Sequence, residues 1–173
     1  MLYFLENHDE QRIASDFFCG SAMKAIPAAA MSLFFQKNPF MLYSGQEFGE
    51  KGMDKEGFSG TDGRTTIFDY WSPETLAHAY QDSSDSALSQ EQKYLAATYR
   101  QLLHFATEEK AIREGETFDL MYVNPGSENF DPRTNFAFLR KKDDEAMLIV
   151  LNFAQEARQL QVCIPGHAFD FFH

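Results

Sequence analysis

One short segment of the chain concentrates side chains that could do electrostatic or acid–base chemistry. The segment Glu6–Asp9 follows the apolar residues 1–5 at once, and Arg12 lies three positions further on. The carboxylate of Asp9 can stabilise a developing positive charge or accept hydrogen bonds from sugar hydroxyls, and His8 can donate one. Arg12 can keep a neighbouring carboxylate ionised. The alternative is a solvated loop whose charges satisfy one another.

A second polar cluster follows another short apolar run. Residues 40–43 are apolar, and Gln46 and Glu47 come shortly after them. Between the two runs, apolar residues at helical spacing predict a helix over 20–37, which Pro27 should kink or restart. The order of strand, helix and strand favours a parallel pair, whose polar residues at the carboxyl ends of the strands would share a pocket.

The middle of the chain contains a loop and a long helix. Residues 49–63 hold five of the ten glycines, at a spacing that matches neither a dinucleotide fingerprint nor a P-loop. The acidic residues of this loop do not match a calcium-binding loop either. Ser89 and Gln92 form a capping-box signature, which predicts a helix from there to about Thr107.

The last third has the alternating pattern of short strands. From Gly115 onward, apolar residues alternate around 118–122, 136–138 and 160–164, and 147–151 is a continuous apolar run. This pattern predicts an antiparallel sheet. We therefore expect two domains, comprising residues 1–110 and 111–173.

Composition and charge exclude several classes of protein. The 173 residues carry a formal charge of −11, which disfavours nucleic acid as a partner. No apolar run approaches the roughly 20 residues of a membrane-spanning helix. Cys19 and Cys163 have no paired spacing, which argues against a disulfide framework and a cysteine zinc site. Apolar residues at both ends suggest a piece of a longer polypeptide, and the alternative is a domain with buried ends.

Four blocks of the sequence together resemble one enzyme family. Phe4–Asp9, with its aromatic-x-x-Asn-His-Asp run, resembles the block near the seventh barrel strand of the alpha-amylase family, glycoside hydrolase family 13. Asn38–Gly49 resembles the eighth strand and the loop that follows it. Asp62–Trp71 resembles the next segment of some bacterial members, and Asn135–Asn152 resembles strands of the family's C-terminal β-domain.

The resemblance implies a mixed α and β fold in two parts. The first part would be the last two β/α units of a (β/α)8 barrel, within residues 1–110. The second would be an incomplete antiparallel β-sandwich-type domain over 111–173. The implied parent protein is a retaining glycoside hydrolase that acts on α-linked glucans.

The resemblance also assigns roles to residues of the first cluster. Asp9 matches the carboxylate that stabilises the transition state, and His8 matches the histidine that hydrogen-bonds the sugar. The nucleophile and the acid/base of the family lie on earlier barrel strands, upstream of this segment, so the isolated chain is expected to be inactive. The residues expected to bind or shape the substrate site are Asn7, Arg12, Gln46 and Glu47.

The expected partners follow from the same resemblance. They are an α-glucan or maltooligosaccharide, together with the missing upstream half of the barrel or a second copy of the chain. The sequence supports no cofactor, although a calcium ion in the parent enzyme stays open, as does a cytoplasmic or periplasmic location. Two alternatives remain. One is a transglycosylase of the same family, and the other is a non-catalytic module that binds a partner or binds sugars by stacking them on Tyr43, Tyr70 or Trp71.

Overall fold

The computed structural model of the chain describes residues 1–53, 61–65, 67, 74–81 and 87–172. The chain divides into two compact units. Unit 1 comprises Met1–Ala29 and Pro39–Leu102, and unit 2 comprises Ala30–Asn38 and Leu103–His173. Two helices, α1 (Ile26–Phe34) and α3 (Gln90–Glu108), contribute residues to both units. The domain boundary expected between residues 110 and 111 stays a prediction.

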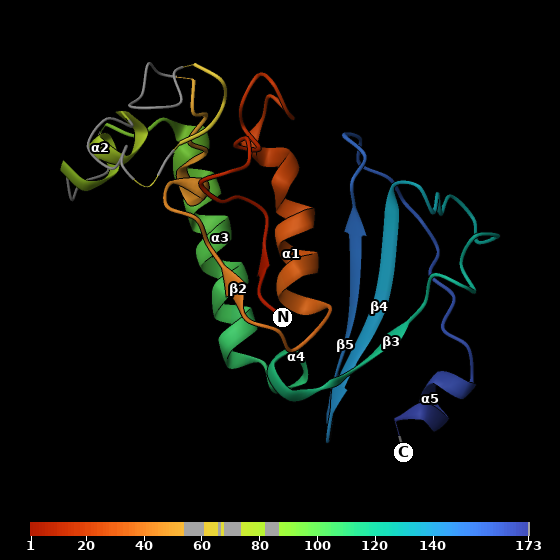
Figure 1. The fold of residues 1–173 in the computed structure, drawn as a ribbon. Coiled ribbons are helices and arrows are strands. Elements are labelled where there is room, and N and C mark those ends of the chain that lie inside the picture. Colours follow the sequence, from red (N-terminus) through yellow and green to blue (C-terminus); the bar gives the residue numbers. More distant parts are fainter. Residues whose placement is uncertain (54–60, 66, 68–73, 82–86, 173) are drawn as a thin grey trace. The chain divides into compact units, whose positions relative to one another are not determined.

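Two short parallel strands lie at the centre of unit 1 (Figure 1). β1 (Tyr3–Phe4) pairs with β2 (Phe40–Met41), with Tyr3 opposite Phe40 and Phe4 opposite Met41. The connection between them is helical, because η1 (Ala22–Ala25) leads directly into α1 (Ile26–Phe34). The predicted order of strand, helix and parallel strand is therefore confirmed, although each strand is shorter than its apolar run.

Pro27 marks the point at which the connecting helix changes type. It is the second residue of α1, directly after the 3-10 turn of η1. The first turn of an α-helix tolerates proline, because a backbone N–H has no partner within the helix there. The α-helix thus begins where the sequence analysis expected it to restart.

The remaining helices of unit 1 include the one with the predicted cap. α3 (Gln90–Glu108) follows Ser89, whose N–H donates to Gln92 Oε1 at 2.8 Å while the Gln92 N–H donates to Ser89 Oγ at 3.2 Å. This reciprocal pair is the predicted capping box. η2 (Gln46–Phe48) and α2 (Glu74–Gln81) were not predicted. The core of unit 1 gathers Ala29, Leu95 and Tyr99 with Leu5, Ala22, Met23, Ile26, Leu42 and Leu102.

Unit 2 is built on a three-stranded antiparallel sheet. The strands are β3 (Glu116–Asp119), β4 (Asn135–Lys142) and β5 (Glu145–Asn152), in the spatial order β3-β4-β5. A two-residue turn joins β4 to β5, since Lys142 pairs with Glu145, and Asp143 there has a φ of 50°. Asp tolerates this left-handed conformation better than most residues. The predicted antiparallel sheet is confirmed for these three strands.

The alternating run at 160–164 does not form a strand, which corrects the sequence analysis. Its backbone bonds to a side chain instead of a neighbouring strand: the Cys163 N–H donates to Asn124 Oδ1 at 2.7 Å, and Asn124 Nδ2 donates to the Cys163 carbonyl at 3.0 Å. Leu160 and Val162 are partly buried against the cluster of Leu120, Phe130 and Ala137, whereas Ile164 is exposed. Side chains two positions apart therefore face the core here without a ladder of backbone hydrogen bonds.

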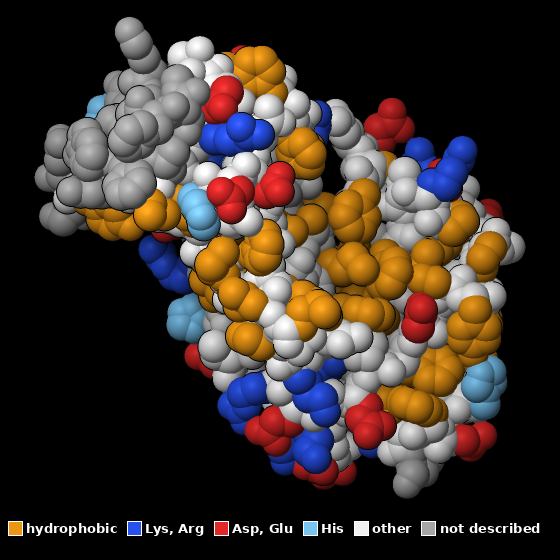
Figure 2. All heavy atoms as spheres, viewed as in Figure 1, with side chains coloured by type: hydrophobic (Ala, Val, Ile, Leu, Met, Phe, Trp, Pro, Cys, Tyr) orange, Lys and Arg blue, Asp and Glu red, His pale blue; other side chains and the backbone are white. Residues whose placement is uncertain are grey.

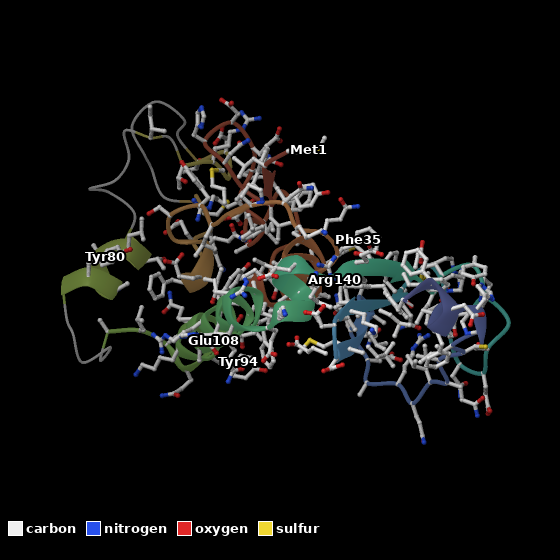
Figure 3. The ribbon with its side chains drawn as sticks, turned by 90° about the horizontal axis from the view of Figure 1, so that it is seen from below. Met1, Phe35, Tyr80, Tyr94, Glu108 and Arg140 are labelled. Carbon is white, nitrogen blue, oxygen red and sulfur yellow. The ribbon has the colours of Figure 1, made fainter. Side chains whose placement is uncertain are left out.

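Arg140 of β4 is a buried hydrogen-bond donor that joins the sheet to neighbouring segments of unit 2. It is 1% exposed, and it donates to the carbonyls of Ala111, Ile112 and Phe35. Figure 3 shows Arg140 beside Phe35, whose ring packs edge-on against Phe138 at 5.1 Å between centroids. One guanidinium thus satisfies carbonyls near the ends of two helices.

Two short helices complete unit 2. α4 (Lys110–Glu114) precedes β3, and α5 (His167–Phe171) lies near the end of the chain. Acidic and basic side chains intermingle around α4 and the β4–β5 turn (Figure 2), where Lys110 bonds to Asp143. Among the described residues, no helix has the length and apolar character needed to cross a membrane.

Candidate active site

The Asn-His-Asp segment forms a tight turn just after β1. Asn7 Oδ1 accepts hydrogen bonds from the backbone N–H groups of Asp9, at 2.8 Å, and Glu10, at 2.9 Å. An asparagine that bonds its own backbone in this way fixes a turn without help from a strand or helix. Asn7 therefore shapes the loop through its side chain.

The two principal candidates for chemistry both face solvent. The side chains of His8 and Asp9 are 52% and 76% exposed, and His8 Nε2 lies 3.5 Å from Asp9 Oδ2. A carboxylate with this exposure is free to approach a ligand, and the adjacent imidazole can donate a hydrogen bond to the same ligand. The structure thus brings the two side chains together on one exposed turn.

Glu6 and Arg12 lie beneath this turn and are almost completely buried. Arg12 Nε is 3.0 Å from Glu6 Oε2, and the two side chains are 1% and 3% exposed. Glu6 Oε1 also accepts a hydrogen bond from the Ile13 N–H at 2.7 Å. The sequence analysis assigned no role to Glu6. Its position between an apolar strand and a polar loop, six residues before an arginine, was the available signal.

Arg12 does not reach solvent, and its bonds are internal. Nη1 donates to Thr65 Oγ1 at 2.7 Å, Nη2 donates to the Ser44 carbonyl at 2.9 Å, and the guanidinium lies 4.8 Å from the centre of the Tyr43 ring. The expectation that Arg12 contacts substrate does not fit this burial, because its donors are directed at the chain itself. Arg12 instead ties the turn to the end of β2.

Gln46 is also committed to internal contacts. Its Nε2 donates to the Tyr99 hydroxyl at 2.9 Å, and its Oε1 accepts from the Tyr43 N–H at 3.4 Å. Gln46 is 3% exposed, so these hydrogen bonds hold the loop after β2 from its buried side. The expectation that Gln46 shapes the site stays a prediction.

Three carboxylates, those of Glu6, Glu47 and Glu50, lie near the charge of Arg12. Burial raises the pKa of Glu6, and the nearby Arg12 only partly opposes this. Burial likewise raises the pKa of Glu47. Oε2 of Glu47 and Oε2 of Glu50 are buried without a hydrogen-bond partner in the described part of the chain. The described side chains here include more carboxylates than cations, and repulsion from Glu50 and Glu47 adds to the burial that raises the pKa of Glu6.

Of the three aromatic residues considered for sugar stacking, the structure describes Tyr43. Tyr70 and Trp71, considered for sugar stacking, lie outside the described residues, and the Tyr43 hydroxyl donates to the Thr65 carbonyl at 2.9 Å. A cavity of about 370 Å³ in unit 1 is lined by residues that include Phe48, Lys51 and Gln92, and not by His8 or Asp9. A metal site is a separate question. Within the described ranges, no group of three or more His, Cys, Asp or Glu residues is arranged to hold a metal ion.

Comparison with solved structures identifies the type of fold. The chain is similar to a noncanonic maltogenic alpha-amylase, AmyB from Thermotoga neapolitana, with a TM-score of 0.52 and 19% identity over 88% of this chain and 28% of that one. It is also similar to AmyP, solved in complex with maltose, with a TM-score of 0.59 and 18% identity over 88% of this chain and 30% of that one.

The similarity lies in the fold and not in the sequence. No family model matches the chain, and no curated protein sequence matches it. At 18–19% identity the two structures show a shared amylase-type fold, which agrees with the mixed α and β class and the antiparallel sheet of unit 2. The chain spans less than a third of the length of either amylase.

Proposed function

We propose that the chain is the C-terminal portion of an alpha-amylase-type retaining glycoside hydrolase that acts on α-linked glucans. The observation that carries this proposal is the exposed pair of His8 and Asp9 on a turn directly after a strand of a parallel pair, within a fold similar to two amylases. The carboxyl ends of parallel barrel strands are where such enzymes place their catalytic groups. β1 and β2 would then be the last two strands of a (β/α)8 barrel.

The roles proposed for the exposed pair follow from the chemistry of glycoside cleavage. Cleavage passes through an oxocarbenium-like transition state, which carries positive charge. An ionised Asp9 stabilises that charge, and His8 donates a hydrogen bond to a sugar hydroxyl. Asn7 holds the turn that presents both side chains, while Gln46 and Glu47 support the site from below. Asp9 is thus a stabilising group and not the nucleophile.

The same mechanism requires groups that this part of the polypeptide does not supply. A retaining enzyme needs a nucleophile and an acid/base about 5–5.5 Å apart. In the proposed arrangement these two carboxylates belong to upstream barrel strands. The chain alone would therefore be inactive, and its barrel half would pair with the upstream half or with a second copy. Unit 2 would correspond to the antiparallel C-terminal β-domain.

Hydrolysis of maltoheptaose by the complete gene product that contains these residues tests the proposal. Asp9→Asn should lower kcat by a factor of about 10² or more, as removal of one preorganised electrostatic group does in other enzymes. Asp16→Asn changes an exposed carboxylate of the same loop and should leave kcat within about twofold. The 173-residue chain alone should release no sugar.

The other outcomes of this experiment separate the alternatives. Near-normal turnover by the Asp9→Asn variant, or hydrolysis by the 173-residue chain alone, would contradict the proposal. Binding of maltoheptaose by the gene product without hydrolysis would indicate a non-catalytic carbohydrate-binding module. Longer oligosaccharides among the products would indicate a transglycosylase with the same site.

A further inference from the structure

The buried ion pair closes the candidate catalytic turn at both of its ends. Glu6 comes directly before Asn7, and Arg12 follows Asp9 by three residues, so their contact at 3.0 Å joins the two ends of one short loop. The exposed side chains of His8 and Asp9 lie within that loop. The ion pair therefore restrains the backbone that carries them.

Arg12 also fixes the closed loop to the neighbouring strand. Its two terminal nitrogens donate to the Ser44 carbonyl, just after β2, and to Thr65 Oγ1. The Arg12 N–H donates to the Gly63 carbonyl at 2.6 Å. The turn after β1 is therefore held in one position relative to the end of β2, which is the edge at which the proposed site lies.

A buried ion pair of this kind adds little to the net free energy of folding. Two charges lose their hydration when they are buried, and apolar side chains of similar volume often stabilise a fold at least as well. The Nε–Oε2 contact is a charge pair without the alignment of a good hydrogen bond. What an ion pair adds over apolar packing is a defined geometry, because the planar guanidinium directs its donors at fixed positions.

We propose that Glu6 and Arg12 are positioning residues that set the location of the Asp9 carboxylate for glycoside cleavage. This inference rests on the proposed function, and it assigns the pair no contact with substrate. The carboxylate must lie close to the developing charge to stabilise it, and a displacement of about 1 Å can cost a factor of 10² in rate. The pair acts by restricting the backbone of the turn.

The first test does not depend on enzyme activity. It measures hydrogen exchange at the backbone amides of Asp9 and Glu10, both of which donate hydrogen bonds to Asn7 Oδ1. Glu6→Gln should raise the exchange rates of both amides by about tenfold, because the loop opens locally. Exchange in β4 and β5 should not change. Arg64→Gln, which removes the exposed Arg64–Asp62 pair in the same unit, is the matched control and should leave both amides unchanged. Unchanged exchange in a folded Glu6→Gln variant would overturn the proposal.

The second test separates positioning from folding in the complete gene product. The double substitution Glu6→Leu/Arg12→Met replaces both charges of the pair with apolar groups of similar volume, so neither partner of the pair is left buried without the other. It should keep Tm near that of the parent, lower kcat by about tenfold or more and change KM by less than about twofold. Arg12→Lys keeps the charge but loses the fork, so its kcat should be intermediate. A folded double variant with unchanged kcat would refute the proposal.

Asp9→Asn in the same assay shows which idea has failed. If Asp9→Asn abolishes turnover while the folded double variant retains it, the positioning role alone is wrong. If Asp9→Asn itself retains turnover, the proposed function is wrong, and the exchange experiment then decides whether the ion pair still restricts the turn. The two failures thus give different patterns.

Discussion

Gln46 and Tyr99 join the loop after β2 to the middle of α3 through one buried hydrogen bond. Gln46 Nε2 donates to the Tyr99 hydroxyl at 2.9 Å, and the two residues are 3% and 1% exposed. Because both side chains are buried, water cannot replace the hydrogen bond between Gln46 Nε2 and the Tyr99 hydroxyl. The helix therefore supports the underside of the candidate site.

Tyr99→Phe should destabilise the chain by about 1–3 kcal/mol, because it removes the acceptor of the buried Gln46 Nε2 group. The urea dependence of unfolding measures this change. Tyr94→Phe on the same helix is the control, since Tyr94 is exposed, and its effect should stay within about 0.5 kcal/mol. Equal effects of the two substitutions would show that the Gln46 bond contributes nothing.

The same burial predicts how Tyr99 titrates. Burial raises the pKa of Tyr99 to about 12, and its hydrogen bond with Gln46 only partly opposes this. The neutral phenol is favoured in the folded state, so the stability that Tyr99 contributes is complete below pH 10 and is lost between pH 10 and about 12. Ultraviolet difference spectra should show one tyrosine that ionises late, and this signal should be absent from Tyr99→Phe.

Local features of the site could be predicted from sequence, whereas its long-range contacts could not. The Ser89–Gln92 capping box needs only residues three apart, so its pattern was sufficient. The burial of Arg12 depends on Ser44 and Thr65, which lie 32 and 53 positions away, and no local pattern contains them. In the sequence, an arginine that binds a ligand cannot be distinguished from one that donates to a backbone carbonyl of its own chain, because both stand in a polar loop after a strand.

The run at 160–164 shows a second limit of sequence patterns. Alternation reports which side chains are buried, and Leu160 and Val162 do pack against the core of unit 2. It does not report where the backbone hydrogen bonds go: here the Asn124 side chain bonds to both backbone groups of Cys163, and the Gln161 N–H donates to the Glu128 carbonyl. A side chain 39 positions away and a loop carbonyl thus replace a strand partner.

The carboxylate cluster predicts greater stability on mild acidification. Burial raises the pKa of both Glu6 and Glu47 above the ordinary value of 4.5. The folded state therefore binds protons more tightly than the unfolded state at these groups. Their contribution to stability is fully present below pH 4.5 and is lost as the pH rises through the raised pKa values. Urea unfolding measured from pH 4.5 to pH 8 should show falling stability.

Carboxylates with the opposite pKa shift act in a different pH range. Hydrogen bonds from Arg133 and Lys110 lower the pKa values of Asp131 and Asp143 below 3.8, so their contribution is lost only as the pH falls through those lowered values. Glu47→Gln should flatten the slope above pH 4.5 and leave the acid limb unchanged. A slope above pH 4.5 that this variant does not alter would exclude Glu47 as its source.

Gly52 should not tolerate a side chain. Its φ is 59°, and an added Cβ would lie 2.8 Å from the Gly63 carbonyl carbon and 2.9 Å from the Arg64 nitrogen. Because both obstacles are backbone atoms, no rotamer change relieves the clash. Gly52→Ala should therefore destabilise the chain by more than about 1 kcal/mol. Gly126→Ala, where nothing lies within 4 Å, is the control and should be neutral or slightly stabilising. Equal thermal stability of the two variants would contradict this close approach.

Arg140 should be essential for the folding of unit 2. Burial lowers its pKa, yet its donors satisfy the carbonyls of Ala111, Ile112 and Phe35, which have few alternatives within the core. Arg140→Met fills similar volume but removes three hydrogen bonds to carbonyls, and although Thr117 and Gly115 still donate to the Phe35 and Ala111 carbonyls, the Ile112 carbonyl loses its side-chain donor. We therefore expect a loss of about 3 kcal/mol in the free energy of unfolding, at about 1 kcal/mol for each hydrogen bond. Arg133→Met removes an arginine that is 87% exposed and should cost less than about 1 kcal/mol. If Arg140→Met unfolds at the same urea concentration as Arg133→Met, water or backbone adjustment must satisfy those carbonyls, and the stability of unit 2 must come from its apolar clusters alone.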